Sequence, residues 1–316
     1  MLLAPAYRDY LWGGTKLEKK WGKTPPEPGA VIAETWELSL REGALCGIKN
    51  GRFAGLTLLE VLEFNPGFAG KKCLSFSKFP LLIKLIDSAA NLSVQVHPSD
   101  AYALVNEKSY GKSEVWFILE AEENAGVFFG FKRDSSEAEV RDRINDGSLT
   151  EILNFTKVKA GDVFMIDAGT VHAVGGGITL AEIQQNSDLT YRVYDFGRTD
   201  KNGKPRELHI EKALTAMNFR AHTGEASVYP YVDYAEFQKR LIADNKYFFS
   251  EFYRLDGACP LCNEDCFTVL TLTAERADIR YGGESLSVVK GDTVFIPAGL
   301  EISASGKAEF IATTLR

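Results

Sequence analysis

The chain of 316 residues lacks three features that would place it in a specialised class: a long apolar run, an excess of basic residues and a dense set of cysteines. No stretch approaches the roughly 18 consecutive apolar residues of a membrane-spanning helix. Arg8 and Asp9 interrupt the apolar start, so we expect no signal peptide. Basic residues number 36 and acidic residues 43, and the net charge of −7 argues against nucleic acid or a membrane as a partner.

The five cysteines are too few and too scattered for a disulfide framework. Cys46 and Cys73 are isolated, and the odd count predicts reduced thiols in a cytoplasmic protein. Cys259, Cys262 and Cys266 lie close together and could begin a structural zinc site. Such a site takes four ligands, and the fourth would have to come from Cys46, Cys73 or His222, so we interpret these three residues as free thiols in a loop.

Short apolar runs, separated by glycine, asparagine and aspartate, dominate the sequence. They predict strands at residues 81–86, 92–97, 114–120, 127–131, 163–166, 178–184 and 267–273. Evidence for helices is sparse: capping-box patterns after Ser136 and Ser148, a start after Pro98, and helical spacing over residues 210–217. With 45% apolar and 25% charged residues, we expect a globular, mainly β protein with a small helical insertion.

One segment occurs twice. Residues 159–169 (KAGDVFMIDAG) match residues 289–299 (VKGDTVFIPAG), and each copy indicates a Gly-Asp turn, a short buried strand and an Ala-Gly turn. The repeat predicts two similar β-barrel units. His172 after the first copy aligns with Ile302 after the second, so we expect chemistry in the first unit only. We divide the chain into domains at residues 1–225 and 226–316.

Residues 92–98 (LSVQVHP) combine a strand pattern with an unusual polar face. On a strand, Ser93, Gln95 and His97 share one side, while the valines between them face the core. An amide and an imidazole on this side could serve a binding site. A solvated sheet face with one hydrogen-bonded histidine would explain the pattern as well.

Residues 111–113 (GKS) resemble the end of a phosphate-binding loop, but the resemblance fails. The first glycine of that motif would fall at Asn106, and a strand rather than a helix follows. Lys112 and Glu114 instead share one face of the strand that begins here. An exposed ion pair at a strand start is the simpler interpretation of these two residues alone.

Four polar residues from three predicted strands could form one metal site. Together they offer two imidazoles, a carboxylate and an amide, which suits a catalytic metal if the strands converge: Gln95, His97, Glu114 and His172. Their spacing does not by itself force this convergence. In a β-barrel, however, inward faces of neighbouring strands meet.

Residues 180–198 contain a strand, a turn at 186–188 and a second strand, which predicts a β-hairpin. In this hairpin Glu182 would face Arg192 across the two strands. A charged ladder on a solvated surface would explain the pair equally well.

Four of these segments, in order, resemble the type I mannose-6-phosphate isomerases, zinc enzymes of the cupin superfamily. The matching residues are 93–98 (SVQVHP), 112–114 (KSE), 169–172 (GTVH) and 182–192, and residues 11–14 (LWGG) and 34–39 (ETWELS) are similar to the family's amino-terminal segment. The length resembles the compact bacterial branch. The resemblance implies cupin jelly-roll β-barrels in two units, the second of them degenerate and without a site.

The resemblance also implies residue roles. Gln95, His97, Glu114 and His172 would bind one zinc ion, Arg192 would be the catalytic arginine, and Lys112 and Glu182 would lie beside the sugar as candidate proton shuttles. Lys84 and Ser93 match positions that the family uses around the phosphate. The longer enzymes have HKPE where this chain has GKSE at residues 111–114, so any role of that histidine is absent here.

The expected activity is the interconversion of mannose 6-phosphate and fructose 6-phosphate through an enediol. Two other functions are compatible with parts of the pattern. A non-haem iron oxygenase uses two histidines and one carboxylate, although Gln95 and the cations Lys84, Lys112 and Arg192 favour a sugar phosphate. A sugar-binding cupin module without catalysis would need an output module, and none is visible. The oligomeric state is left open.

Overall fold

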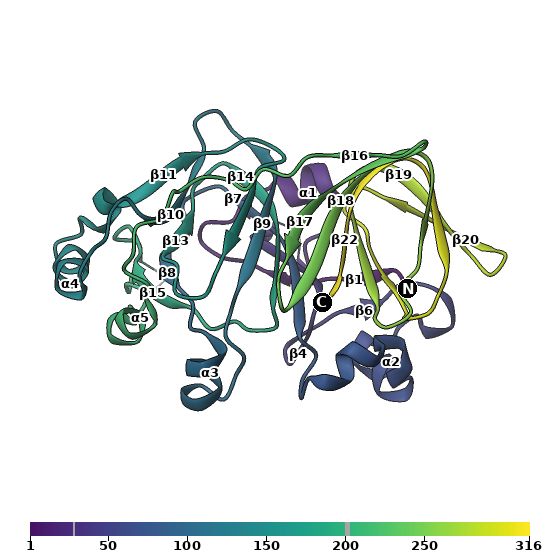
Figure 1. Ribbon diagram of the computed structural model, residues 1–316, viewed down its shortest axis with the longest axis horizontal. Coiled ribbons are helices and arrows are strands. Elements are labelled where there is room, and N and C mark those ends of the chain that lie inside the picture. Colours follow the sequence, from purple (N-terminus) through teal and green to yellow (C-terminus); the bar gives the residue numbers. More distant parts are fainter. Residues whose placement is uncertain (28, 200–202) are drawn as a thin grey trace.

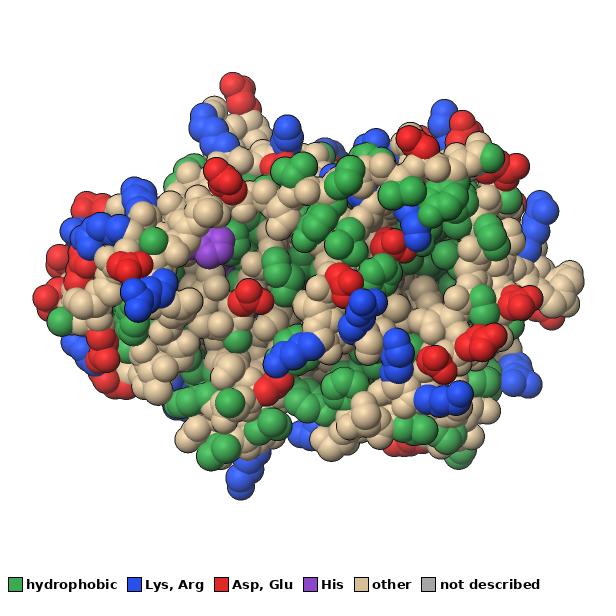
Figure 2. All heavy atoms as spheres, in the orientation of Figure 1, with side chains coloured by type: hydrophobic (Ala, Val, Ile, Leu, Met, Phe, Trp, Pro, Cys, Tyr) green, Lys and Arg blue, Asp and Glu red, His purple; other side chains and the backbone are tan. Residues whose placement is uncertain are grey.

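The computed structural model describes residues 1–27, 29–199 and 203–316 and confirms a mainly β fold. Two facing sheets form the amino-terminal part, and a curved sheet of long strands forms the carboxy-terminal part (Figure 1). Figure 2 shows side chains of both charges interspersed over one face of the molecule, without a large patch of one sign. Within the described residues, no helix is long and apolar enough to cross a membrane.

The first sheet has six antiparallel strands in the order β12-β9-β14-β7-β3-β2. Its strands are β2 (Ala6–Arg8), β3 (Glu34–Leu38), β7 (Leu81–Ser88), β9 (Glu114–Ala121), β12 (Val163–Ile166) and β14 (Ile178–Gln185). Both faces of β7 and β14 are buried along their whole length, so polar residues of these strands, such as Lys84 and Glu182, are buried together with the apolar ones.

The second sheet has five strands in the order β11-β10-β13-β8-β15. They are β8 (Val94–Val96), β10 (Gly126–Phe131), β11 (Leu153–Lys157), β13 (His172–Val174) and β15 (Tyr191–Tyr194). A buried cluster joins the two sheets, with Trp116 and Leu180 from the first and Val127 and Phe129 from the second. The two sheets therefore enclose one shared interior.

The carboxy-terminal sheet has seven strands in the order β16-β17-β18-β22-β19-β20, with β21 paired to β19. They are β16 (Val232–Asp233), β17 (Phe237–Asp244), β18 (Phe248–Leu261), β19 (Thr268–Tyr281), β20 (Glu284–Val289), β21 (Thr293–Ile296) and β22 (Ile302–Leu315). The outer face of the six-stranded sheet packs against it, and Phe117 stacks on Phe252 with 4.9 Å between ring centroids. Alternate side chains of β9 thus pack into two different hydrophobic cores, one on each face of the six-stranded sheet.

Short elements complete the fold. The helices are α1 (Lys16–Trp21), α2 (Leu58–Phe64), α3 (Asp100–Asn106), α4 (Glu137–Asn145) and α5 (Ile210–Ala216), and the 3₁₀ helices are η1 (Gly51–Phe53), η2 (Pro66–Ala69), η3 (Lys71–Ser75) and η4 (Leu149–Ile152). Two small ladders pair β1 (Leu3–Ala4) with β6 (Gly47–Ile48) and β4 (Leu40–Arg41) with β5 (Ala44–Leu45). Helices α4 and α5 cover the outer face of the five-stranded sheet (Figure 1).

The helix predictions have mixed outcomes. Ser136 caps α4 by accepting a hydrogen bond from the Glu139 backbone amide, and the predicted helices after Pro98 and over residues 210–217 are present. The capping box after Ser148 is wrong. The Ser148 hydroxyl donates to Asp146 Oδ1 at 2.6 Å instead, and only the 3₁₀ helix η4 follows. An acidic side chain two residues upstream competes successfully for the hydroxyl.

The two repeat copies have the same local structure. In each copy an aspartate side chain accepts from a backbone amide three residues upstream, at 2.9 Å for Asp162 and 3.0 Å for Asp292. Gly161 and Gly291 have φ of 91° and 89°, a conformation that glycine adopts without strain. The strand after each copy starts at the aligned position, β13 at His172 and β22 at Ile302.

The predicted hairpin over residues 180–198 is wrong. Strand β14 lies between β7 and β9 in the six-stranded sheet, whereas β15 pairs with β8 in the five-stranded sheet. Both edges of β14 are occupied by other strands, so no edge is left for β15. The connection at residues 186–188 instead carries the chain from one sheet to the other, and Ser187 Oγ anchors it by donating to the Tyr110 carbonyl at 2.8 Å.

Candidate active site

Three predicted metal ligands converge where the two facing sheets meet. Their ligand atoms lie within 4.8 Å of one another, and all three side chains are buried: His97, Glu114 and His172. His97 Nε2 is 3.7 Å from Glu114 Oε2, and His172 Nε2 is 3.5 Å from Glu114 Oε1. Glu114 begins β9 in one sheet, and His172 begins β13 in the other. Separate β-sheets therefore supply the parts of one cluster.

Backbone carbonyls orient both imidazoles of the cluster. His97 Nδ1 lies 2.8 Å from the Leu189 carbonyl, and His172 Nδ1 lies 2.8 Å from the Thr170 carbonyl. Since a carbonyl only accepts, each Nδ1 carries the proton and each Nε2 presents a lone pair toward Glu114. Burial lowers the pKa of His97 to about 4, with a further contribution from Lys112, and burial also lowers the pKa of His172. Both rings are neutral near pH 7, as metal ligands must be.

The polar atoms of this cluster are poorly satisfied. Among the described residues, His97 Nε2 and both carboxylate oxygens of Glu114 are buried without a hydrogen-bond partner. Burial alone would raise the pKa of Glu114, but the charge of Lys112 holds it well below its usual range. Lys112 Nζ lies 2.8 Å from Glu114 Oε2 as an ion pair. A buried anion and unpaired lone pairs aimed at one point fit a bound cation.

Gln95 reaches the same cluster from the five-stranded sheet. Strand β8 places Gln95 opposite His172 in register, and Gln95 Nε2 lies 3.3 Å from His172 Nε2. On its other side Gln95 is opposite Arg192 of β15. The amide can therefore turn its oxygen toward the same point as the three buried residues. The structure brings all four sequence-predicted ligands together.

One wall of the adjacent cavity carries a row of alternating charges. Lys84 Nζ lies 2.9 Å from Glu182 Oε1 and 3.8 Å from Glu34 Oε2, and Lys112 Nζ lies 3.6 Å from Glu182 Oε1. Trp116 Nε1 donates to Glu182 Oε2 at 3.1 Å. Burial alone would lower the pKa of Lys84, but Glu182 and Glu34 outweigh it and raise that pKa. The row leads from Glu34 through Glu182 to the metal cluster.

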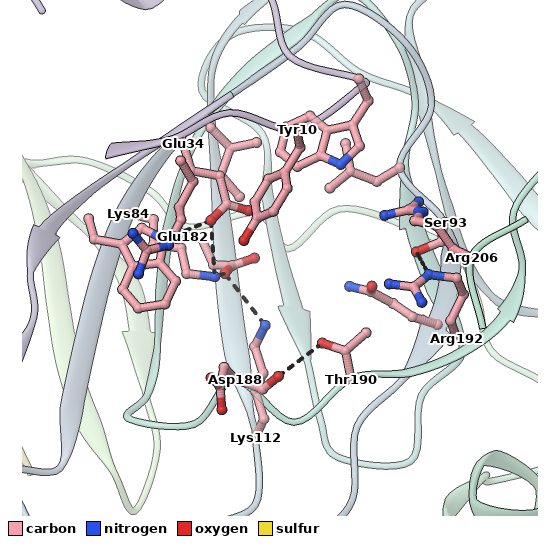
Figure 3. Close-up of a pocket in the computed structure, with 16 residues that line it drawn as sticks. Tyr10, Glu34, Lys84, Ser93, Lys112, Glu182, Asp188, Thr190, Arg192 and Arg206 are labelled. Atoms are coloured by element: carbon pink, nitrogen blue, oxygen red, sulfur yellow. Dashed lines mark hydrogen bonds and ion pairs between the residues drawn. The ribbon is translucent and has the colours of Figure 1, made fainter. Parts of the chain in front are cut away.

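The opposite wall carries arginines and Ser93 (Figure 3). Arg192 Nε donates to Ser93 Oγ at 3.3 Å, and Arg192 Nη1 donates to the Glu207 carbonyl at 2.9 Å. Burial lowers the pKa of Arg192, and repulsion from Arg206 adds to this. Arg206 Nε donates to Asp195 Oδ2 at 2.7 Å, which holds Arg206 in place. This wall presents positive charge and a hydroxyl to the cavity, which suits a phosphate or a developing oxyanion.

The cavity between these walls has a volume of about 390 Å³, enough for a small polar ligand. Six of the predicted site residues line it: Lys84, Ser93, Gln95, Lys112, Glu182 and Arg192. Figure 3 shows Lys84 and Glu182 on one side and Ser93 and Arg192 on the other. Glu182 and Arg192 thus face each other across the cavity, from two sheets, and not across a hairpin.

Sequence reasoning missed several residues that line the cavity. They include Arg8, Tyr10, Glu34, Trp36, Asp188 and Arg206. Glu34 and Trp36 belong to the segment at residues 34–39 that resembles the isomerase family, so a closer reading of that segment could have found them. Nothing in the sequence around Arg206 distinguishes it from a surface arginine, and only the fold brings it to the cavity.

The five cysteines are not part of this site, and all are free thiols. Cys46, Cys259 and Cys266 are buried, Cys73 is half-buried and Cys262 is exposed. Among the described residues, the only group of three or more potential ligands with metal-binding spacing is His97, Glu114 and His172.

Comparison with known proteins agrees with the sugar-phosphate site that the geometry suits. Residues 1–119 match the sequence profile described as phosphomannose isomerase type I, catalytic domain. Mannose-6-phosphate isomerase ManA of Bacillus subtilis is 33% identical over 317 residues, which cover 100% of this chain and 98% of the relative. Mannose-6-phosphate isomerase of Streptococcus mutans is 33% identical over 96% of this chain and 94% of its own length.

A solved structure extends the likeness to the fold. The crystal structure of the mannose 6-phosphate isomerase from Bacillus subtilis aligns with a TM-score of 0.91 and 30% identity, over 99% of this chain and 98% of that chain. The matched profile ends inside β9, so Glu182, His172 and Arg192 lie beyond it. For these residues the likeness depends on the full-length relatives and the shared fold.

Proposed function

The chain belongs to the type I phosphomannose isomerase family and has the activity of a mannose-6-phosphate isomerase, and we propose that one zinc ion assists its reaction. The substrates are mannose 6-phosphate and fructose 6-phosphate. The observation that carries the proposal is the buried cluster of His97, Glu114 and His172. It contacts Gln95 and Lys112, which line a cavity whose two walls carry complementary charged groups.

Four residues would hold the zinc ion: Gln95, His97, Glu114 and His172. Two neutral imidazoles, a carboxylate and an amide suit zinc, and the carbonyl contacts at Nδ1 of both histidines orient the rings as metal-binding histidines require. When bound, zinc supplies a Lewis acid for the sugar oxygens. The same two histidines and carboxylate would suit iron, but Gln95 as a fourth ligand and the cationic far wall favour zinc and a sugar phosphate.

The isomerisation moves a proton between C1 and C2 of the open-chain sugar, and Lys112 and Glu182 are placed to carry it. Both line the cavity, and their charged atoms lie 3.6 Å apart. A proton taken from carbon by one can therefore be shared with the other. Lys84 and Trp116 hold the Glu182 carboxylate from its two oxygens, so its position does not depend on the substrate.

We assign to the far wall the binding of negative charge on the substrate. Arg192 lies beside Gln95 in register, so its guanidinium can stabilise the oxyanion that develops at the reacting carbons. Arg206 and Ser93, on the same wall, are placed to bind the phosphate. Lys84 lies on the opposite wall, paired with Glu182 and Glu34, and there it supports the proton-carrying pair.

A coupled assay with mannose 6-phosphate, combined with metal analysis, tests the proposal. The purified protein is expected to contain about one zinc ion per chain, to lose activity on chelation, and to regain it with Zn²⁺ but not with Fe²⁺. His172→Ala is expected to lose the metal, whereas the matched variant His222→Ala, which changes a histidine outside the cavity, is expected to keep it. An active His172→Ala protein without metal would rule out the zinc site.

We also propose a cytoplasmic location for the enzyme. The support is the set of five free thiols, two of which (Cys262 and Cys73) are at least partly accessible. Such thiols persist in a reducing compartment and oxidise outside it.

A further inference from the structure

A second polar crevice lies between the six-stranded sheet and the carboxy-terminal sheet. Strands β9 and β17 are in contact there (Figure 1). The crevice has a volume of about 130 Å³ and shares none of its described lining residues with the cavity of the proposed active site. Its described lining includes three cationic side chains, Arg240, Arg254 and Lys290, and one carboxylate, Glu309.

Arg240 is the least compensated of these cations. Its guanidinium lies 5.1 Å from the ring centroid of Tyr231, 5.5 Å from Phe117 and 5.7 Å from Phe252. Nη2 donates to the Gly161 carbonyl at 2.6 Å, but Nε is buried without a partner among the described residues. Arg254 is paired with Glu309 and Lys290 with Glu120, whereas no described carboxylate is paired with Arg240.

Thr273 provides a second unpaired donor in the same crevice. Its side chain is only 7% exposed, and its hydroxyl is buried without a hydrogen-bond partner among the described residues. It lies on β19, at the irregularity between Leu272 and Ala274 in the pairing with β22. Buried donors are almost always satisfied, so two unpaired donors that border one small space indicate an occupant.

We propose that this crevice binds a small oxyanion of the phosphate or sulfate class. Water could satisfy the two donors, but it would leave the charge of Arg240 uncompensated. A tetrahedral oxyanion accepts from a guanidinium, a hydroxyl and an ammonium at once, and about 130 Å³ accommodates it. The aromatic rings around Arg240 lower the local dielectric constant and so strengthen its interaction with an anion.

The same chemistry could come from the free ion or from the phosphoryl group of a small metabolite. The crevice uses no residue of the isomerase site, so this proposal does not depend on the proposed function. A phosphoryl group on a larger ligand would need the rest of that ligand to leave through the side bordered by Arg254, which is 50% exposed, and Glu309, which is 36% exposed.

Isothermal titration calorimetry on the full chain tests the proposal with inorganic phosphate, sulfate and glycerol phosphate in turn. Phosphate is expected to occupy two classes of site in the wild type. Arg206→Gln removes the class in the active-site cavity, and Arg240→Met removes the class in the crevice. Binding of glycerol phosphate as tight as that of phosphate would identify the phosphoryl group of a metabolite, and binding of the free ions alone would identify the free oxyanion.

Thr273→Val gives the sharpest measurement, because it replaces one hydroxyl by a methyl group and keeps the packing. It also tests the proposal if Arg240→Met does not fold. Loss of one hydrogen bond to an anion is expected to weaken binding in the crevice about tenfold. The matched control Thr179→Val changes another buried threonine with an unpaired hydroxyl, outside the crevice, and is expected to bind as the wild type does. A wild-type phosphate titration that Arg240→Met leaves unchanged, or equal titrations of Thr273→Val and Thr179→Val, would overturn the proposal.

Discussion

The two copies of the repeated segment adopt the same turns but lead into interiors of opposite character. After the first copy, β13 begins with His172, which is buried 3.5 Å from Glu114. After the second copy, β22 begins with Ile302, which joins an apolar cluster in which Tyr253 and Phe310 stack at 4.9 Å. The Gly-Asp and Ala-Gly turns therefore specify the backbone conformation, whereas the side chain at the start of the next strand decides whether a polar site can form.

The second copy has a structural role at the contact between the sheets. Thr293 Oγ1 of β21 donates to Glu37 Oε2 at 2.9 Å, and Lys23 Nζ pairs with Glu37 Oε1 at 2.6 Å. Glu37 and Lys23 are both buried. We propose a domain boundary near residue 225. Within residues 1–27, 29–199 and 203–316, no strand ladder joins the carboxy-terminal sheet to the others, and the pairings that cross are isolated bridges such as Leu2 to Val294.

The largest expected effect comes from making the first copy like the second. His172→Ile should remove the metal and lower kcat/KM by a factor on the order of 10³ or more, because the Lewis acid and one orienting ligand are lost together. The converse change, Ile302→His, should create no metal site, since Ile302 lies in a cluster of buried apolar residues, and potential ligands in the described part of the chain group only at His97, Glu114 and His172. Metal content and the coupled assay measure both; a metal-binding Ile302→His protein would contradict the comparison.

The next largest effect concerns the buried contact between the sheets. Glu37→Ala leaves Lys23 buried without its partner and should lower the free energy of unfolding by about 3–5 kcal/mol. The double variant Glu37→Ala with Lys23→Met should recover a large part of that loss, because no unpaired charge remains. Urea unfolding curves decide this. Equal stability of the single and the double variant would show that the ion pair is not the source of the effect.

A smaller effect separates charge stabilisation from phosphate binding within the active first unit. Arg192→Lys keeps a cation but loses the forked geometry, so it should lower kcat about 10²-fold and change KM little. Ser93→Ala should mainly raise KM if Ser93 holds the phosphate equally throughout the reaction. Steady-state kinetics on both variants provide the measurement. If Arg192→Lys raises KM while kcat stays near that of the wild type, then Arg192 anchors the phosphate instead.

The smallest effect is on pH-dependent stability and belongs to Asp195. Burial alone would raise its pKa, but Arg206 and Arg198 outweigh burial and hold the pKa below its usual range. A carboxylate with a lowered pKa stabilises the fold above the unfolded pKa of about 3.9, and this stabilisation is lost as the pH falls through the folded pKa. Asp195→Asn should therefore cost about 1–2 kcal/mol at pH 7 and much less below pH 3. If the cost of Asp195→Asn does not change with pH, the stabilisation does not come from ionised Asp195.

Much of the fold could be predicted because the information is local. Apolar runs of four to eight residues between turn residues give the strands, and the start of α4 follows from the Ser136 cap. The four ligand candidates were recognisable because imidazole, amide and carboxylate side chains alternate with core residues along short strands. The repeat was recognisable because its matching Gly-Asp and Ala-Gly residues specify the same turns, in which the two aspartates make the same side-chain hydrogen bond.

The strands, the repeated turns and the four candidate ligands could therefore be predicted from the sequence, because their causes lie within a few neighbouring residues. Only the tertiary structure decided which strands are neighbours: β14 has both edges filled by β7 and β9, so Arg192 approaches Glu182 from another sheet rather than from a hairpin. It also brought Arg206 and Glu34 to the cavity from distant parts of the chain. The physical reason is that strand pairing is set by burial and free edges across the whole molecule, which no local pattern contains.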